Sequence, residues 1–87
     1  MPVNLVEYTR PLEPGDRVRM KSCVRLKDLA NIGIDAEFLF SATECGDLRD
    51  LKQQKYTVYR VCRDGDISLR ELPFSWRTNM FYRVSRR

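Results

Sequence analysis

The segment YTVYRVCRDGDISL, residues 56–69, decides the fold because it contains two strand patterns separated by a turn signal. Its first half is rich in aromatic and β-branched side chains, which favour extended backbone. Asp64 and Gly65 then form a dipeptide that is typical of a tight hairpin turn. In the second half, Ile67 and Leu69 alternate with polar residues, so both side chains are expected on one face. The segment therefore predicts a β-hairpin.

The apolar residues in the first half of this hairpin do not keep a period of two, because Val58 and Val61 lie three positions apart. Two explanations stay open. Either both faces of the strand are partly covered, or a β-bulge lies between the two valines.

A second strand pattern lies upstream, where the turn signal Pro14-Gly15-Asp16 precedes residues 17–21. Charged and apolar residues alternate strictly here, so Val18 and Met20 are expected in the core. The opposite face would then carry three basic side chains, which are Arg17, Arg19 and Lys21.

A short helix is expected after this strand. Apolar residues recur over residues 26–32 at the three-to-four spacing of an amphipathic helix. Ser22 is the candidate N-cap, and Gly33 is expected to end the helix.

A second short helix is expected after a connecting passage, residues 34–40. Ser41 or Thr43 would cap it, and Leu48 and Leu51 would share one face. Both helices are too short to be stable alone, so they must pack on a sheet.

The C-terminal part adds the last strand. Pro73 is expected to end the strand of residues 66–70, residues 74–76 to form a connection, and residues 80–84 to form a closing strand. Residues 1–13 are expected to form an N-terminal arm or an edge strand. The sequence thus predicts a mainly β fold for residues 14–87, a small antiparallel barrel of about five strands with one or two short helices.

Composition limits the functional classes. With 87 residues, 43% of them hydrophobic, the chain suits one small domain. We see no signal peptide and no apolar run long enough to span a membrane, so we expect a cytoplasmic protein. The three cysteines, Cys23, Cys45 and Cys62, are widely spaced and the chain has no histidine, so we expect reduced, partly buried thiols, no metal site and no cofactor.

The sequence gives little support for any catalytic group. The most plausible nucleophile is Cys23, which lies beside Lys21 and Arg25, but a buried or half-buried thiol is the favoured interpretation. Two carboxylate pairs, Asp47 with Asp50 and Asp64 with Asp66, suit turns or the surface better than acid–base chemistry. We therefore expect no enzyme activity.

The order of these segments resembles a loose group of small phage and prophage proteins of unassigned function that are built like the Src-homology-3 barrel. The similarity runs from about residue 14 to 84, although Gln53-Gln54 stands where a glycine usually turns the chain into the next strand. The resemblance implies a fold and a genomic setting, and it brings no catalytic or ligand-binding residue. The matching residues are Gly15-Asp16-Arg17-Val18-Arg19, Lys21-Ser22, Tyr56-Thr57-Val58, Asp64-Gly65-Asp66-Ile67-Ser68-Leu69, Trp76 and Asn79-Met80-Phe81.

The surface is the expected working part, because the net charge of +4 is concentrated in basic stretches. Arg83, Arg86 and Arg87 add charge near the C-terminus. Trp76 is expected either to line a groove that takes a partner or to plug one end of the barrel. The candidate partner-binding residues are Trp76, Tyr59, Tyr82, Arg17, Arg19, Lys21, Arg70 and Arg77.

These residues predict a small non-enzymatic accessory protein that binds or inhibits a host or phage macromolecule by surface contact, with a host-defence inhibitor as one form. A protein partner is favoured. The alternative is a small nucleic-acid-binding protein that uses the basic strand face, and a plain solvated exterior is the third interpretation of the same charges.

Overall fold

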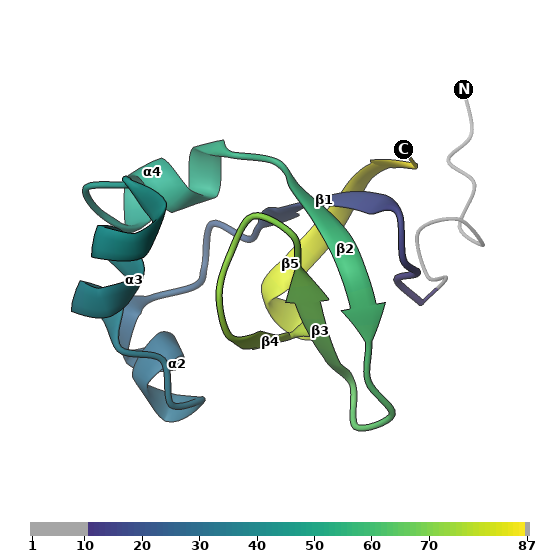
Figure 1. Cartoon of the computed structure of the whole chain (residues 1–87), viewed down its shortest axis with the longest axis horizontal. Coiled ribbons are helices and arrows are strands. Elements are labelled where there is room, and N and C mark those ends of the chain that lie inside the picture. Colours follow the sequence, from purple (N-terminus) through teal and green to yellow (C-terminus); the bar gives the residue numbers. More distant parts are fainter. Residues whose placement is uncertain (1–10, 87) are drawn as a thin grey trace.

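A computed structural model describes residues 11–86, which form one five-stranded antiparallel sheet and short helices (Figure 1). The sheet has the order β4-β3-β2-β1-β5, so β1 lies between β2 and β5. This confirms the expected mainly β class. The strands are β1 (Asp16–Met20), β2 (Tyr56–Val61), β3 (Asp66–Leu69), β4 (Ser75–Arg77) and β5 (Phe81–Arg86).

The β2–β3 hairpin forms where the sequence predicts it. Gly65 has a φ of 91°, a conformation that glycine adopts without a Cβ clash, and the backbone N–H of Cys62 donates to the carbonyl of Asp66 across the turn at 2.8 Å. The register shifts between Val58 and Arg60, which confirms a bulge in this strand.

Three α-helices lie together beside the sheet, rather than the one or two expected (Figure 1). The first, α2 (Leu26–Asn31), occupies the predicted stretch, and Gly33 follows its end with a φ of 84°. The expected N-cap is wrong by three residues. Arg25 takes the N-cap position, and its backbone N–H donates to the Asp28 carboxylate at 2.8 Å, which satisfies one of the free amides at the helix start.

The helix α3 (Ala36–Thr43) was not predicted, because residues 34–40 were expected to be only a connection. Asp35 caps it, since its side chain accepts hydrogen bonds from the amides of Glu37 and Phe38. The apolar residues of this stretch are consecutive rather than periodic, so they give no helical spacing in the sequence.

The helix α4 (Leu48–Gln53) matches the second expected helix but has a different cap. Its N-cap is Asp47, which accepts the Asp50 amide at 3.0 Å, whereas the expected caps Ser41 and Thr43 lie inside α3. The carboxylates of this stretch therefore serve the helix start, as expected for turn residues.

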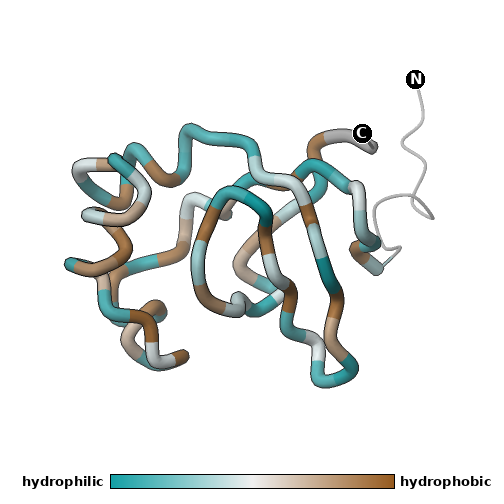
Figure 2. The backbone as a smooth tube through the Cα atoms, in the orientation of Figure 1, coloured by the Kyte–Doolittle hydropathy of each residue, from teal (hydrophilic) through white to brown (hydrophobic). Residues whose placement is uncertain are grey.

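The core lies between the helices and the inner face of the sheet. Each helix contributes one fully buried leucine, and each of the five strands contributes at least one buried residue. Figure 2 shows that hydrophobic residues recur along both the helices and the strands. The largest fully buried side chains are Trp76, Leu29, Leu39, Leu51, Ile67, Val18 and Val58.

The stretch around Trp76 is a strand and not the predicted connection. In β4, Trp76 pairs with Ile67 of β3, and a 3₁₀ turn (Thr78–Met80) leads into β5, which begins at Phe81. The sheet curls so far that the rings of Trp76 and Phe81, from its two edge strands, make an edge-to-face contact with centroids 5.6 Å apart.

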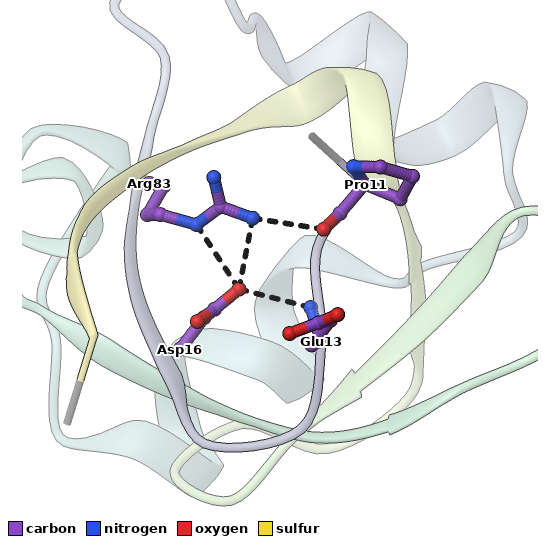
Figure 3. Close-up of polar contacts among 4 residues, drawn as sticks. All are labelled: Pro11, Glu13, Asp16 and Arg83. Carbon is purple, nitrogen blue, oxygen red and sulfur yellow. Dashed lines mark hydrogen bonds and ion pairs between the residues drawn. The ribbon is translucent and has the colours of Figure 1, made fainter. Parts of the chain in front are cut away.

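The N-terminal arm is described only from Pro11, so the expectation for residues 1–13 lies mostly outside the described residues, and residues 11–13 form no strand. These residues are tied to the sheet by an ion pair between Arg83 and Asp16, with Nη2 and Oδ2 3.0 Å apart (Figure 3). The Asp16 carboxylate also accepts the Glu13 amide at 2.9 Å, and Arg83 donates to the Pro11 carbonyl at 2.8 Å. Arg83 therefore stabilises the fold, whereas the sequence predicted that it adds to the basic surface.

Candidate functional site

The outward face of the sheet gathers five of the predicted partner-binding residues. In β1, Asp16, Val18 and Met20 are buried, so Arg17 and Arg19 lie half-exposed on the opposite face. We call this surface the basic sheet face, and it comprises Arg17, Arg19, Tyr59, Arg70 and Tyr82.

The strand register places these residues side by side. Arg19 lies opposite Tyr82 of β5, and Arg17 lies opposite Thr57 of β2. Residues directly opposite in an antiparallel pair have Cβ atoms about 4.5–5.5 Å apart. A basic and an aromatic side chain are therefore neighbours on this face.

Tyr59 lies on the outward face of β2, because Tyr56 and Val58 alternate with it and are buried. It falls between Val58 and Arg60, where the pairing with β3 skips a residue, and 60% of its surface is exposed. Arg70 follows β3 directly, and its amide donates to the Thr57 carbonyl at 3.0 Å, which brings it beside the same strand.

A concavity of about 480 Å³ opens on the basic sheet face. It brings together three predicted site residues, Arg17, Tyr59 and Arg70, and of the described residues that line it none is acidic. The remaining lining residues are Pro14, Gly15, Thr57 and Val58.

Two arginines on this face have buried donors without acceptors. The Nε atoms of Arg17 and Arg19 are inaccessible to solvent and have no hydrogen-bond partner within residues 11–86. A buried donor without an acceptor carries a desolvation cost.

Glu71 and Thr57 also belong to this region, and neither is among the predicted site residues. The Glu71 carboxylate accepts two hydrogen bonds from Thr57, one from the amide at 2.7 Å and one from the hydroxyl at 3.0 Å. Nothing in the local sequence pattern signals this contact, because the two residues are 14 positions apart and meet only when β2 and β3 pair.

Trp76 does not belong to the candidate surface. It is completely buried, its Nε1–H donates to the Pro73 carbonyl at 2.9 Å, and its ring packs on Phe81. Of the two interpretations of this residue, burial supports a core role, because a side chain without exposed surface offers no face to a partner.

Lys21 and Arg77 lie apart from the concavity. Lys21 follows β1, and its amide donates to the Met80 carbonyl at 2.8 Å. Arg77 extends from β4, forms an exposed ion pair with Asp66 at 3.3 Å, and borders a second concavity of about 460 Å³ that also contains Cys23.

The candidate catalytic groups are dispersed. All three cysteines are free thiols, and Cys23 is exposed rather than buried as expected. Asp64 accepts the Asp66 amide at 3.2 Å, which is the turn role predicted for that pair. Across the described part of the chain, no three His, Cys, Asp or Glu residues gather as metal ligands would, and no helix there is long and apolar enough to cross a bilayer.

A scan against protein-family models, a search of curated proteins and a search of solved structures each gave no match to this chain.

Proposed function

We propose that this chain is a small non-enzymatic binding protein that acts through the basic sheet face. The observation that carries the proposal is the grouping of Arg17, Arg19 and Arg70 with two exposed tyrosines on one side of the sheet. The guanidinium groups of these arginines can pair with carboxylate or phosphate oxygens of a partner.

The preferred partner is a protein with an acidic surface, and the role is that of an accessory or inhibitory protein in the cytoplasm of a host cell. Opposite charge on a partner accelerates association and sets its orientation. The resemblance to phage proteins with a Src-homology-3-like barrel supports the setting, and the strongly curled five-stranded sheet is compatible with that barrel. Inhibition of a host defence protein is one form of this role.

A single-stranded nucleic acid is the second candidate partner. The observation that favours it is that Tyr59 and Tyr82 are exposed beside arginines, because bases stack on aromatic rings while phosphates pair with guanidinium groups.

The test is an affinity pull-down from host lysate, run with and without nuclease, using the wild-type chain and the double variant Arg17→Glu plus Arg19→Glu. We expect the wild type to retain a protein that survives nuclease treatment and the double variant to lose it. The matched control is Lys27→Glu plus Arg49→Glu, which makes the same charge change at exposed positions of α2 and α4. Equal loss in both double variants would contradict a role for the basic sheet face.

A salt titration separates the two partner classes. Binding of labelled single-stranded DNA or RNA that weakens steeply as salt rises would favour the nucleic-acid function, because phosphate contacts release bound counterions.

A further inference from the structure

We propose that the concavity on the basic sheet face is a binding site for one nucleotide, with the phosphate between Arg17 and Arg70 and the base on the ring of Tyr59. This inference rests on the second candidate partner of the proposed function, and it competes with an acidic protein for the same face. A nucleotide reaches the site either free or as one unit of a single strand. The two sources share a phosphate next to a planar ring.

The positive charge of the residues that line the concavity favours the binding of an anion. Arg17 and Arg70 are its charged lining residues, and none of the described residues that line it is acidic. Guanidinium groups match phosphate geometry well.

The volume of the concavity and its aromatic wall favour a ligand that carries a planar ring in addition to the anionic group. The volume of about 480 Å³ lies within the range of about 300–1,000 Å³ that is typical of small-molecule sites. Tyr59 lines this space, and its side chain is 60% exposed, so its ring is accessible for stacking. Stacking on an exposed tyrosine is how many proteins hold unpaired bases.

The site is preformed by backbone contacts. The Gly15 amide donates to the Val58 carbonyl at 2.9 Å, which joins the Pro14–Gly15 wall to the strand that carries Tyr59. On the other side, the Arg70 amide donates to the Thr57 carbonyl at 3.0 Å. A preformed site loses little conformational entropy when a ligand binds.

Glu71 places a carboxylate beside the concavity. Its carboxylate takes two hydrogen bonds from Thr57, which lines the concavity. The same carboxylate repels a phosphate that is bound nearby, so Glu71 is expected to weaken nucleotide binding and to keep the affinity of the site moderate.

The test measures amide chemical shifts of the ¹⁵N-labelled chain during titration with thymidine monophosphate, and fluorescence anisotropy of a labelled oligothymidylate. We expect shifts at the amides of Gly15, Thr57 and Tyr59 with both probes. Shifts with the mononucleotide alone would assign the site to free nucleotides, and much tighter binding of the oligothymidylate would assign it to single strands.

Variants separate the contributions of the residues. Tyr59→Ala is expected to weaken binding by about tenfold, whereas Tyr59→Phe keeps the ring and the affinity. Arg17→Gln is expected to cost about tenfold through the lost charged contact, and to reduce the steepness of the salt dependence. Glu71→Gln is expected to strengthen binding by a few-fold, because it removes the repelling charge and keeps the size of the side chain.

Three results would overturn the inference: no shift with either probe, equal binding by Tyr59→Ala and the wild type, or equal affinity for polyglutamate and for the oligothymidylate. The last result would indicate an acidic protein as the occupant. The proposed function fails separately, because it requires that a captured partner be lost in the Arg17→Glu plus Arg19→Glu variant whether or not Tyr59 contributes.

Discussion

The inner and outer faces of the sheet differ in how their polar groups are satisfied. On the inner side, the hydroxyl of Tyr56 donates to the Leu51 carbonyl, and the indole N–H of Trp76 donates to Pro73. On the outer side, the Nε atoms of Arg17 and Arg19 are buried without acceptors. These two inner polar groups are therefore satisfied by contacts within the chain, whereas the two outer donors have no acceptor among the described residues.

Two tyrosines of the same strand illustrate this difference. Tyr56 is 2% exposed and packs edge-to-face on Phe81, while Tyr59, three residues later, is 60% exposed. The same side chain thus serves stability at one position and is available for recognition at the other. The predictions below test whether stability and binding separate along this division.

The largest effect is expected at Trp76. Trp76→Ala removes a fully buried ring and its hydrogen bond, so we expect the free energy of unfolding to fall by about 3–5 kcal/mol, a large part of the stability of a small domain. Urea denaturation measures this. Tyr59→Ala is the control, with a change of less than about 0.5 kcal/mol. A large loss of stability in Tyr59→Ala would contradict the separation between an inner face that stabilises the fold and an outer face that is available for binding.

A smaller loss is expected from the buried ion pair at the N-terminal end of β1. Asp16→Asn removes the buried ion pair between this carboxylate and the guanidinium of Arg83, so we expect a loss of about 3 kcal/mol. Asp66→Asn is the matched control. It breaks the pair with Arg77, whose side chain is 54% exposed, and is expected to cost less than about 1 kcal/mol. Similar urea midpoints for the two variants would refute the expected difference between the buried and the exposed ion pair.

Tyr56 gives the inner face a dependence on pH. Burial raises the pKa of its hydroxyl above the ordinary value near 10, and the nearby Cys45 and Glu71 charges add to the shift. The folded state therefore keeps the proton more tightly than the unfolded chain does. The resulting stability is fully present below about pH 10 and is lost as the pH rises above it.

The variant Tyr56→Phe tests this dependence. Near pH 8 it is expected to cost about 1 kcal/mol, through loss of the hydrogen bond to Leu51. Above pH 10 its deficit relative to the wild type should shrink, because phenylalanine has no proton to lose. Urea midpoints measured across this range check the prediction, and a constant deficit would contradict it.

The smallest effect on stability is expected on the outer face. Arg17→Gln and Arg19→Gln remove charges whose Nε atoms have no acceptor among the described residues, so the free energy of unfolding should change by less than about 0.5 kcal/mol each. Thermal denaturation measures this. A loss above about 2 kcal/mol would show that these arginines support the fold, and it would weaken their assignment to a binding face.

The strands were largely predictable, because alternation along residues 17–21 and 66–70 reports directly which side chains are inward. The positions at which the helices begin were not predicted correctly. Asp35 and Asp47 cap α3 and α4 with their own carboxylates, whereas at α2 the Arg25 amide donates to Asp28. The helix α3 was missed for a related reason, since its apolar residues are adjacent in sequence and give no period.

The candidate site was predicted in part. The sequence indicated Arg17, Arg19 and Tyr59, because alternation predicts a basic strand face and aromatic residues are candidates for contact with a partner. It did not indicate Glu71, whose contact with Thr57 depends on strand pairing. It could not decide between the two interpretations of Trp76, because burial depends on how the sheet curls.

The sequence by itself determined the strand pattern, the hairpin at Gly65 and the excess of basic residues, because these follow from side-chain periodicity, turn chemistry and composition. Only the tertiary structure decided which of those residues share a surface. Curling of the sheet buried Trp76 against Phe81, the ion pair with Asp16 drew Arg83 inward, and pairing of β1, β2 and β3 brought Arg17, Tyr59 and Arg70 around one concavity. Such groupings depend on contacts between residues that are distant in the chain, which no local pattern records.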